Sequence, residues 1–386
     1  MYVTWPLSMY RKHPEALSEA LPARAGSGYL VIQDEEAQNF RFFGLCKDSE
    51  LYDFPFPQNK DLTVRHSDGE NTSSYEVFMI PVIGQPLSSN QYYVIQRRGK
   101  HKGEAHANST EEDKGTCLCF QYVRDKKPSP SNPDDIYQQF VIFRRESFGF
   151  GGFHAKSVAP DGYPPEFLRR KGWSLHGKTP KNFFLDDDAP GVNDSQRSKL
   201  PSLDFSIDRK SSDPVVVGKW YCPFMFIKDG VVGDQIKTSA FYKMALQQRW
   251  EQVHACDNPA NGGNAVEVDA VVQKEAIRVF GEEAGEGNVS DGVMWFRSRI
   301  GGIGLSMAIV EGMRWEEERV GWMKEGEERG RVNRVEEFIK RGSSEEGWKR
   351  FGCYALVESF VLKRMDGTLV LAYDFMHTHQ VRSKWE

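Results

Sequence analysis

The sequence predicts a mainly β, α+β fold made of two antiparallel β lobes with a few short helices. Short runs rich in Val, Ile, Phe and Tyr recur along the chain, each bounded by Gly, Pro, Asn or Asp, as is typical of strands and turns. In the first half these runs follow one another without helical patterns between them, which argues against a parallel βαβ sheet. Aromatic residues make up 12% of the chain, and their side chains suit half-buried pleated surfaces.

The predicted N-terminal lobe spans residues 1–150. It begins with a short helix around 14–20. Its strand-like runs then lie at 28–32, 40–46, 62–65, 75–83, 92–97, 117–123 and 137–144. Pro81 marks its strand as an edge strand or the site of a bulge, because proline has no N–H to donate to a sheet.

Residues 151–213 are predicted to form an irregular connecting segment, in which Pro165 opens one helical turn that carries Phe167 and Leu168 inward. The C-terminal antiparallel lobe spans 214–386 and begins with a strand at 215–228. Residues 238–256 fit either a helix or a strand, and both interpretations stay open. Further strands are expected at 265–280, 292–297 and 305–315, and a short amphipathic helix is expected at 333–340.

The last predicted element is a two-stranded hairpin over 354–377. Asp366-Gly367 favours a two-residue type I′ turn, in which both central residues have positive φ. Both faces of the hairpin are largely apolar, so we expect it to be covered on both sides. The turn sets a register that pairs Arg364 with Leu369, Lys363 with Val370, Leu362 with Leu371, Phe360 with Tyr373, Glu358 with Phe375 and Ser359 with Asp374.

Composition points to a soluble, cytoplasmic protein. The net charge of −5 argues against a surface that attracts nucleic acid or anionic membrane everywhere. The first residues lack the basic and apolar regions of a secretory signal, and no apolar run reaches the roughly 18 residues of a transmembrane segment. We therefore expect the six cysteines to be reduced thiols.

One pattern suggests a serine hydrolase. Gly304-Leu-Ser-Met-Ala308 approximates the G-x-S-x-G nucleophile elbow, and Asp374 with His377 or His379 follows Ser306 in the order of an α/β-hydrolase triad. The surrounding α/β alternation is missing, however, and strand alternation places Asp374 and His377 on opposite faces. The favoured interpretation is a glycine-rich loop that enters a strand, with no catalytic residues.

His377 and His379 share one strand face, as half of a metal site would require. No Cys, Asp or Glu completes the site at a recognisable spacing, so we expect no metal and no cofactor. Glu358 lies on an apolar face of the hairpin. It is either a buried acid with a raised pKa or, as we favour, the partner of a basic residue on a neighbouring strand, because burial of a lone carboxylate is costly.

A basic run provides the candidate binding surface. Arg97, Arg98, Lys100 and Lys102 could contact a phosphate, a phosphoinositide or a nucleic-acid backbone, or serve as a nuclear address. A solvated loop is the alternative, because charge runs are usually solvated. The sequence contains neither a Walker loop nor a G-x-G-x-x-G motif after a strand.

Several motifs resemble a known family, the plant-specific domain of unknown function 1262. They are Met1-Tyr-Val-Thr with Pro6-Leu-Ser-Met-Tyr-Arg11, Pro86-Leu-Ser-Ser-Asn90, Asp135-Ile-Tyr-Gln-Gln139, Asp161-Gly-Tyr-Pro-Pro-Glu-Phe-Leu-Arg-Arg-Lys-Gly-Trp173, Gly218-Lys-Trp-Tyr-Cys-Pro-Phe224 and His377-Thr-His-Gln-Val-Arg-Ser-Lys-Trp-Glu386. The resemblance implies an intracellular plant protein and brings no assigned reaction, ligand or catalytic residue.

Together these observations predict a non-enzymatic binding or interaction protein, cytoplasmic or nuclear, with a protein or an anionic ligand as its partner. A role in plant stress or defence is the working hypothesis for its context. The alternative function is a serine hydrolase that uses Ser306.

Overall fold

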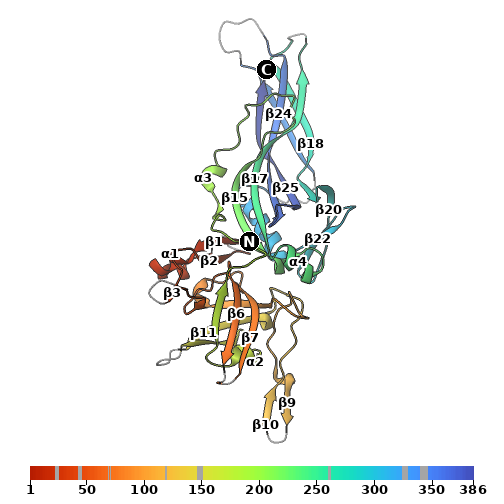
Figure 1. Ribbon diagram of the computed structural model, residues 1–386. Helices are drawn as coiled ribbons and strands as arrows, with labels where there is room; N and C mark the ends of the chain where they lie inside the picture. The colour runs from red at the N-terminus through yellow and green to blue at the C-terminus, as the bar shows by residue number, and fades with distance from the viewer. Residues whose placement is uncertain are drawn as a thin grey trace.

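The computed structural model describes residues 1–21, 26–41, 46–67, 69, 71–117, 120–145, 151–259, 262–323, 329–339 and 347–386. Strands dominate these residues, and the helices are few and short (Figure 1). The prediction of a mainly β protein is therefore confirmed.

The larger sheet has 12 strands in the order β16-β22-β21-β20-β19-β25-β24-β17-β15-β1-β2, with β14 paired to β15. Its pairs are antiparallel except β1 with β2, which is parallel. The strands are β1 Tyr2–Pro6, β2 Gly28–Ile32, β14 Gly191–Val192, β15 Val215–Pro223, β16 Ile227–Lys228, β17 Phe241–Asp257, β19 Glu275–Val279, β20 Glu282–Ser290, β21 Val293–Arg297, β22 Gly302–Ser306, β24 Arg350–Arg364 and β25 Leu369–Trp385.

The smaller sheet has 7 strands in the order β12-β11-β8-β7-β6-β13-β5, all antiparallel. They are β5 Glu50–Leu51, β6 Asp61–Ser67, β7 Thr72–Pro81, β8 Gln91–Gln96, β11 Gln139–Arg145, β12 Gly152–Ser157 and β13 Ser174–Lys178. Three further pairs join β3 Phe40–Arg41 to β4 Cys46–Lys47, β9 Lys114–Cys117 to β10 Phe120–Val123, and β18 Ala265–Gln273 to β23 Arg329–Glu337.

The α-helices are α1 Leu7–Lys12, α2 Glu166–Arg169, α3 Asp194–Arg197, α4 Val232–Thr238 and α5 Met307–Glu318. Short 3₁₀ helices lie at η1 Pro14–Ser18, η2 Leu87–Ser89, η3 Glu111–Asp113, η4 Ile136–Gln138 and η5 Phe224–Phe226. The predicted helical turn after Pro165 is α2, and it buries Phe167 and Leu168 as expected. The predicted helix at 14–20 is the 3₁₀ turn η1.

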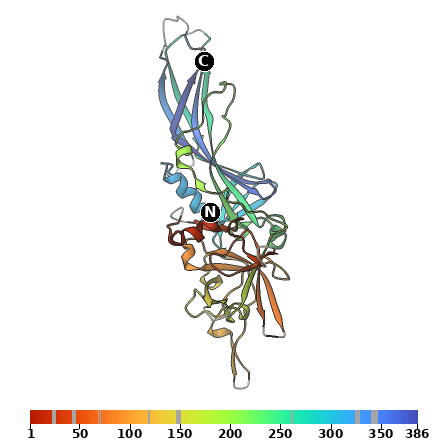
Figure 2. The ribbon, with the colours of Figure 1, turned by 60° about the vertical axis from the view of Figure 1, so that its left-hand side comes forward.

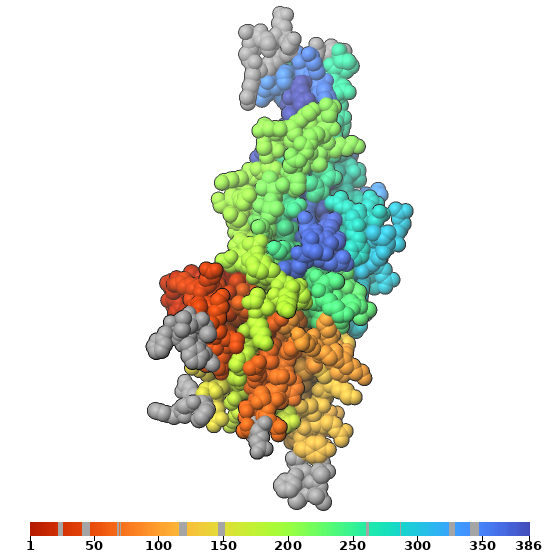
Figure 3. All heavy atoms as spheres, viewed as in Figure 1, coloured from red at the N-terminus to blue at the C-terminus, as the bar shows by residue number. Residues whose placement is uncertain are grey.

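The molecule is elongated (Figures 1 and 2). The smaller sheet lies at one end, and the long strands β17, β24 and β25 run to the other end, where the C-terminus lies; the N-terminus lies between them. The segment 198–213, which we call the strap, covers one face of these long strands (yellow-green in Figure 3). Leu200, Leu203 and Phe205 of the strap pack against the buried Trp250 and its neighbours.

The largest hydrophobic core joins the two sheets. Phe78 of β7 contacts Phe224 with ring centroids 5.5 Å apart, and Tyr93 of β8 contacts Phe226 at 6.2 Å. A second core covers the other face of the smaller sheet, and a third lies beneath β18 and β23. Each sheet therefore buries apolar side chains in a hydrophobic core.

Sheet membership does not follow the predicted boundaries at residues 150 and 213. β1 and β2 join the larger sheet with the C-terminal strands, whereas β12 and β13 complete the smaller one. The two-lobe division stays a prediction.

The C-terminal hairpin has the predicted register away from its turn. Leu362 pairs with Leu371, Phe360 with Tyr373, Glu358 with Phe375 and Ser359 with Asp374. At the turn the prediction is wrong, because Lys363 pairs with Leu369. Gly367 has φ 89°, while Asp366 is not among the positive-φ residues, and Arg364 N donates to Thr368 O at 2.9 Å. This is a three-residue loop whose glycine takes the left-handed conformation, rather than a type I′ turn.

Three other predictions about elements are resolved. Residues 238–256 are mostly strand, as β17. The strand predicted at 305–315 is wrong: helix α5 begins at Met307, because its buried residues Ile309, Val310 and Met313 have helical spacing. The helix predicted at 333–340 is also wrong, since β23 alternates there and pairs with β18. The interiors of the predicted strands at 40–46 and 117–123 lie outside the described residues.

Candidate functional site

Ser306 lies where β22 ends and α5 begins. The order strand, serine, helix of a nucleophile elbow is therefore present locally. The backbone of Ser306 is unstrained, with φ −54° and ψ 140°, and its side chain is buried. β22 pairs antiparallel with both β16 and β21, whereas the elbow is a sharp, strained turn on an α/β sheet.

Asp374 belongs to an ion-pair network on one face of β25. Its carboxylate accepts hydrogen bonds from Arg249 and Arg278, each at 2.8 Å, and from Ser359 at 2.6 Å. His377 lies on the opposite face of the strand. Within the part of the chain that the structure describes, no hydrogen bond joins Ser306 to Asp374, His377 or His379.

A group of buried charged side chains lies between α3, α5 and the long strands. This buried charge cluster consists of Arg197 on α3, Glu316 and Glu317 on α5, Glu358 on β24 and His377 on β25. Each of the five is at most 4% exposed. Charged groups are stable at such depth only when they are paired and hydrogen-bonded.

Arg197 is the centre of the cluster. Its guanidinium donates hydrogen bonds to both carboxylate oxygens of Glu358, with Nε 3.0 Å from Oε1. Nη1 lies 3.3 Å from Oε2 of Glu316, and Nη2 lies 3.4 Å from Oε1 of Glu317. Gln248 of β17 donates a further hydrogen bond of 2.7 Å to Glu358. Burial alone would raise the pKa of Glu358, but the hydrogen bonds and charge of Arg197 outweigh burial and hold that pKa below its usual value. The predicted ion pair of Glu358 is confirmed, although its partner comes from a helix.

Glu317 and His377 form a buried hydrogen-bonded pair. Nε2 of His377 lies 2.8 Å from Oε2 of Glu317. Burial, together with the nearby Glu358, raises the pKa of Glu317 well above its usual value. Burial lowers the pKa of His377 to about 4. Burial therefore favours the neutral form of both groups.

Two arginines lie beside the carboxylates of the cluster. Arg197 and Arg319 provide two positive charges, and Arg319 contacts Glu316 at 2.5 Å. Glu316 and Glu358 provide two negative charges. Arg319 also pairs with Asp194 at 2.8 Å, so the two arginines offset most of the buried negative charge, which makes its burial tolerable.

Among the described residues, Glu317, Glu358 and His377 are the group whose ligand atoms could hold a metal ion, since they lie within 4.8 Å of one another. Arg197 already donates to both carboxylates and supplies the positive charge that a metal would bring. We therefore interpret the cluster as an ion-pair network that ties α3 and α5 to the C-terminal hairpin.

Sequence reasoning missed three members of this cluster. Arg197 lies in the predicted irregular segment 151–213, although Asn193 caps α3 by accepting a hydrogen bond from Gln196 N, a recognisable start signal. Glu316 and Glu317 directly follow the run 305–315, which was predicted to be a strand. Their spacing from Met313 continues the buried stripe of α5, so a helical interpretation would have placed them inward.

Arg97, the first residue of the predicted anion patch, is structural. Its side chain is 11% exposed and its Nη1 lies 2.6 Å from Oδ1 of Asp61. The guanidinium also lies 4.8 Å from the centre of the Phe78 ring. Arg97 therefore fixes the base of the loop to the smaller sheet.

The other three basic residues face outward to different degrees. Arg98 is 79% exposed in its side chain and pairs with Glu76 at 2.6 Å. Lys100 is exposed, and Lys102 is half-buried. Burial, and then the neighbouring cation Lys237 of α4, lowers the pKa of Lys102. Lys237 pairs with Asp234 at 2.7 Å, and Asp234 acts on the pKa of Lys102 in the opposite direction to Lys237.

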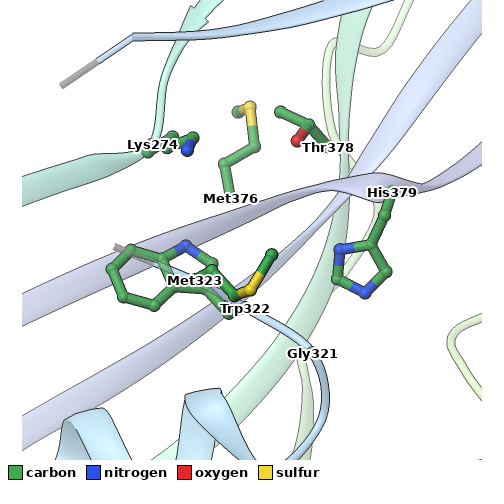
Figure 4. A pocket seen from close by; sticks show the side chains of 7 residues that line it. All are labelled: Lys274, Gly321, Trp322, Met323, Met376, Thr378 and His379. Atoms are coloured by element: carbon green, nitrogen blue, oxygen red, sulfur yellow. The ribbon is translucent and has the colours of Figure 1, made fainter. Parts of the chain in front are cut away.

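His379 lines a small pocket of about 160 Å³ beside β25. In Figure 4, His379, Trp322 and Met323 lie on one side of the β25 ribbon, whereas Met376 and Thr378 lie on the other. Lys274 and Gly321 complete the lining. The volume is below the range of about 300–1,000 Å³ that is usual for small-molecule sites.

A family model described as "Protein of unknown function (DUF1262)" matches residues 24–120. This match supports the resemblance noted from the sequence motifs, and it includes the basic loop but not Ser306 or the buried charge cluster. Among solved structures, the chain is similar to one described as "Crystal structure of Cry35Ab1". The two are 9% identical with a TM-score of 0.46, over 86% of this chain and 90% of that chain. No curated protein sequence matches. Within the described residues, the helices are too short or too polar to cross a membrane.

Proposed function

We propose that this is a non-enzymatic binding protein whose contact surface is the loop 97–102 together with Lys237, and whose ligand carries phosphate. The observation that supports this most is the position of Lys102. It is half-buried, its charged neighbours are the cations Lys237 and Arg97 and the carboxylate of Asp234, and within the described residues Lys102 forms no ion pair. A bound anion would relieve this repulsion.

The loop is held in one conformation before any ligand arrives. Gly103 N donates to Gln96 O at 2.8 Å, and the Gln96 side chain donates to Arg98 O at 2.8 Å. Gly103 has φ 87°, and a Cβ there would lie 2.7 Å from Val232 of α4. Glycine is therefore required where the loop packs on α4, and the pre-organised loop loses little entropy on binding.

The test compares two double variants on phosphoinositide vesicles and on a single-stranded oligonucleotide. Lys100→Ala/Lys102→Ala removes the unpaired cations and is expected to weaken binding to whichever probe the wild type binds. Lys199→Ala/Lys210→Ala removes two exposed lysines from the strap region and serves as the matched control for net charge. Equal losses for both pairs would show a non-specific charge effect and contradict the proposal.

Arg97→Ala separates structure from binding. We expect it to lower the melting temperature because it breaks the contact with Asp61, whereas Lys100→Ala should leave melting unchanged. An unchanged melting temperature for Arg97→Ala would contradict the structural role of Arg97, and Arg97 would again be a candidate for ligand binding.

A serine hydrolase is the competing proposal, and the strand–serine–helix order at Ser306 supports it. A fluorophosphonate probe that labels the wild type but not Ser306→Ala would favour it over the binding role. Absence of labelling, or equal labelling of both proteins, would eliminate it.

The motif resemblance supports a plant setting for the binding role, in the cytoplasm or nucleus, during stress or defence. The two predicted lobes, 1–150 and 214–386, would then contribute the loop and Lys237 respectively. Pull-down from plant extract with the wild type and the Lys100→Ala/Lys102→Ala variant tests whether partners depend on this surface.

A further inference from the structure

The antiparallel pair β18–β23 is a separate two-stranded sheet at the end of the molecule that carries the C-terminus (Figure 1). One face of this pair is fixed, because Val266, Val268 and Val332 are buried in the core beneath it. The outer edges of the two strands lack such a partner. In the part of the chain that the structure describes, no other strand pairs with the outer edge of β18 or of β23.

The ladder shows which backbone groups point outward. Phe338 N donates to Asn264 O at 2.7 Å, so the pair just beyond the strand ends exchanges hydrogen bonds. Hydrogen-bonded and non-hydrogen-bonded pairs alternate in an antiparallel ladder, and no register shift interrupts this one. The N–H and C=O groups that face away from β18 therefore belong to the alternate residues Arg329, Arg331, Asn333, Val335 and Glu337.

Elsewhere the fold covers such an edge. On β2, which ends the larger sheet, Val31 N donates to the Gln58 side chain at 2.6 Å and Gln58 N donates to Val31 O at 2.9 Å. β23 has no such cover within the described residues, and it contains neither proline nor a bulge. An uncovered, regular edge is the usual template for addition of another strand.

We infer that β23 pairs antiparallel with β23 of a second copy of this chain, about a two-fold axis at Asn333. In that register every outward backbone group of one strand meets an outward group of the other. Arg329 of each copy faces Glu337 of the other, and neither residue has an ion-pair partner within the described residues. The positive start and negative end of β23 thus make the edge complementary to itself.

The same argument disfavours the other edge. A two-fold pairing of β18 about its central outward residue would place Asp269 opposite Asp269, and like charges directly opposite are destabilising. Shifting the β23 axis to Arg331 would likewise oppose two arginines. Asp269 and Arg331 pair with each other across the ladder at 2.5 Å, which weakens both repulsions; charge therefore favours the β23 pairing about Asn333 over these two arrangements.

One strand pair buries less than the roughly 1,600 Å² of a standard stable interface, so the dimer is expected to be weak and concentration-dependent. Sedimentation equilibrium across the micromolar to millimolar range measures it. Wild type is expected to show a reversible monomer–dimer equilibrium, and a monomer throughout that range would overturn the inference.

Proline substitutions distinguish the edges. Asn333→Pro removes an outward N–H without touching the β18 ladder, and it should raise the dimer dissociation constant about tenfold or more. Glu267→Pro makes the matched change on the outer edge of β18 and should leave that constant unchanged. A dimer that survives Asn333→Pro, or that Glu267→Pro weakens equally, would contradict the inference.

An exchange of charges between Arg329 and Glu337 tests the register. Rescue by the double variant distinguishes a broken ion pair from a folding defect. Arg329→Glu is expected to weaken the dimer about tenfold, and adding Glu337→Arg should restore it. Failure of the double variant to recover, with both variants folded by circular dichroism, would exclude the proposed register.

Discussion

Arg197→Met tests whether the buried charge cluster stabilises the C-terminal half of the fold. Methionine keeps most of the apolar stem of arginine but removes every hydrogen bond to Glu358, Glu316 and Glu317. Among the described residues, Gln248 would then remain as a hydrogen-bond donor to the buried Glu358, with Nε2 of His377 3.8 Å away. Removal of one partner of a buried ion pair typically costs about 3–5 kcal/mol, because the other charge is left uncompensated. We expect a loss of that size in the free energy of unfolding.

The matched control is Arg209→Met on the strap, twelve residues further along the chain. Arg209 pairs with Asp213 at 2.7 Å, but their side chains are 50% and 84% exposed, so water screens the pair. Its loss should change stability little. A second variant identifies the cause: Glu358→Gln added to Arg197→Met removes the orphaned charge and should recover at least about 1 kcal/mol.

Equilibrium unfolding in urea, followed by far-UV circular dichroism and tryptophan fluorescence, provides the measurement. Trp250 is a useful reporter because its indole N–H donates to Pro201 O of the strap at 2.7 Å. Coincident curves from the two probes would justify a two-state fit. A loss for Arg197→Met no larger than that for Arg209→Met would refute the assignment of the cluster as a stabilising network.

Three further predictions concern the hairpin and its neighbours. Leu362→Asp should cost more than about 4 kcal/mol, because it places an unpaired charge in the main core, and wild-type melting of this variant would show that the core assignment is wrong. Gly367→Ala should cost about 1 kcal/mol in urea unfolding, since φ is 89° there, and an unchanged midpoint would contradict the turn. Burial raises the pKa of folded Glu317, so the contribution of Glu317 to stability should fall as the pH rises from its unfolded pKa of about 4.5 through its raised folded pKa. Burial lowers the pKa of folded His377 to about 4, so the contribution of His377 to stability should fall as the pH falls from about 6.5 to about 4. Relative to wild type, Glu317→Gln should therefore gain stability as the pH rises above about 4.5 in urea titrations, and a constant difference would show that the fold does not raise the pKa of Glu317.

Much of the fold could be read from local patterns. β2 was predicted to the residue, and the register of the C-terminal hairpin was correct from Leu362 to Val357. Period-two alternation between turn residues is a local signal, and a hairpin places its partners close in the sequence. The errors at α5 and β23 have the same origin, because short amphipathic runs fit both periods until a neighbouring element selects one.

The candidate site was much less predictable. The sequence by itself determined that Glu358 would need a positive partner and that Asp374 and His377 would face opposite ways, since both follow from strand geometry and the cost of burying charge. It could not identify Arg197, which lies 161 positions away along the chain and reaches Glu358 from helix α3. Protonation of Glu317 is likewise a tertiary property, because it depends on burial and on neighbouring charges from separate elements. Local chemistry thus defined the requirement, and only the packing of distant segments determined which residue met it.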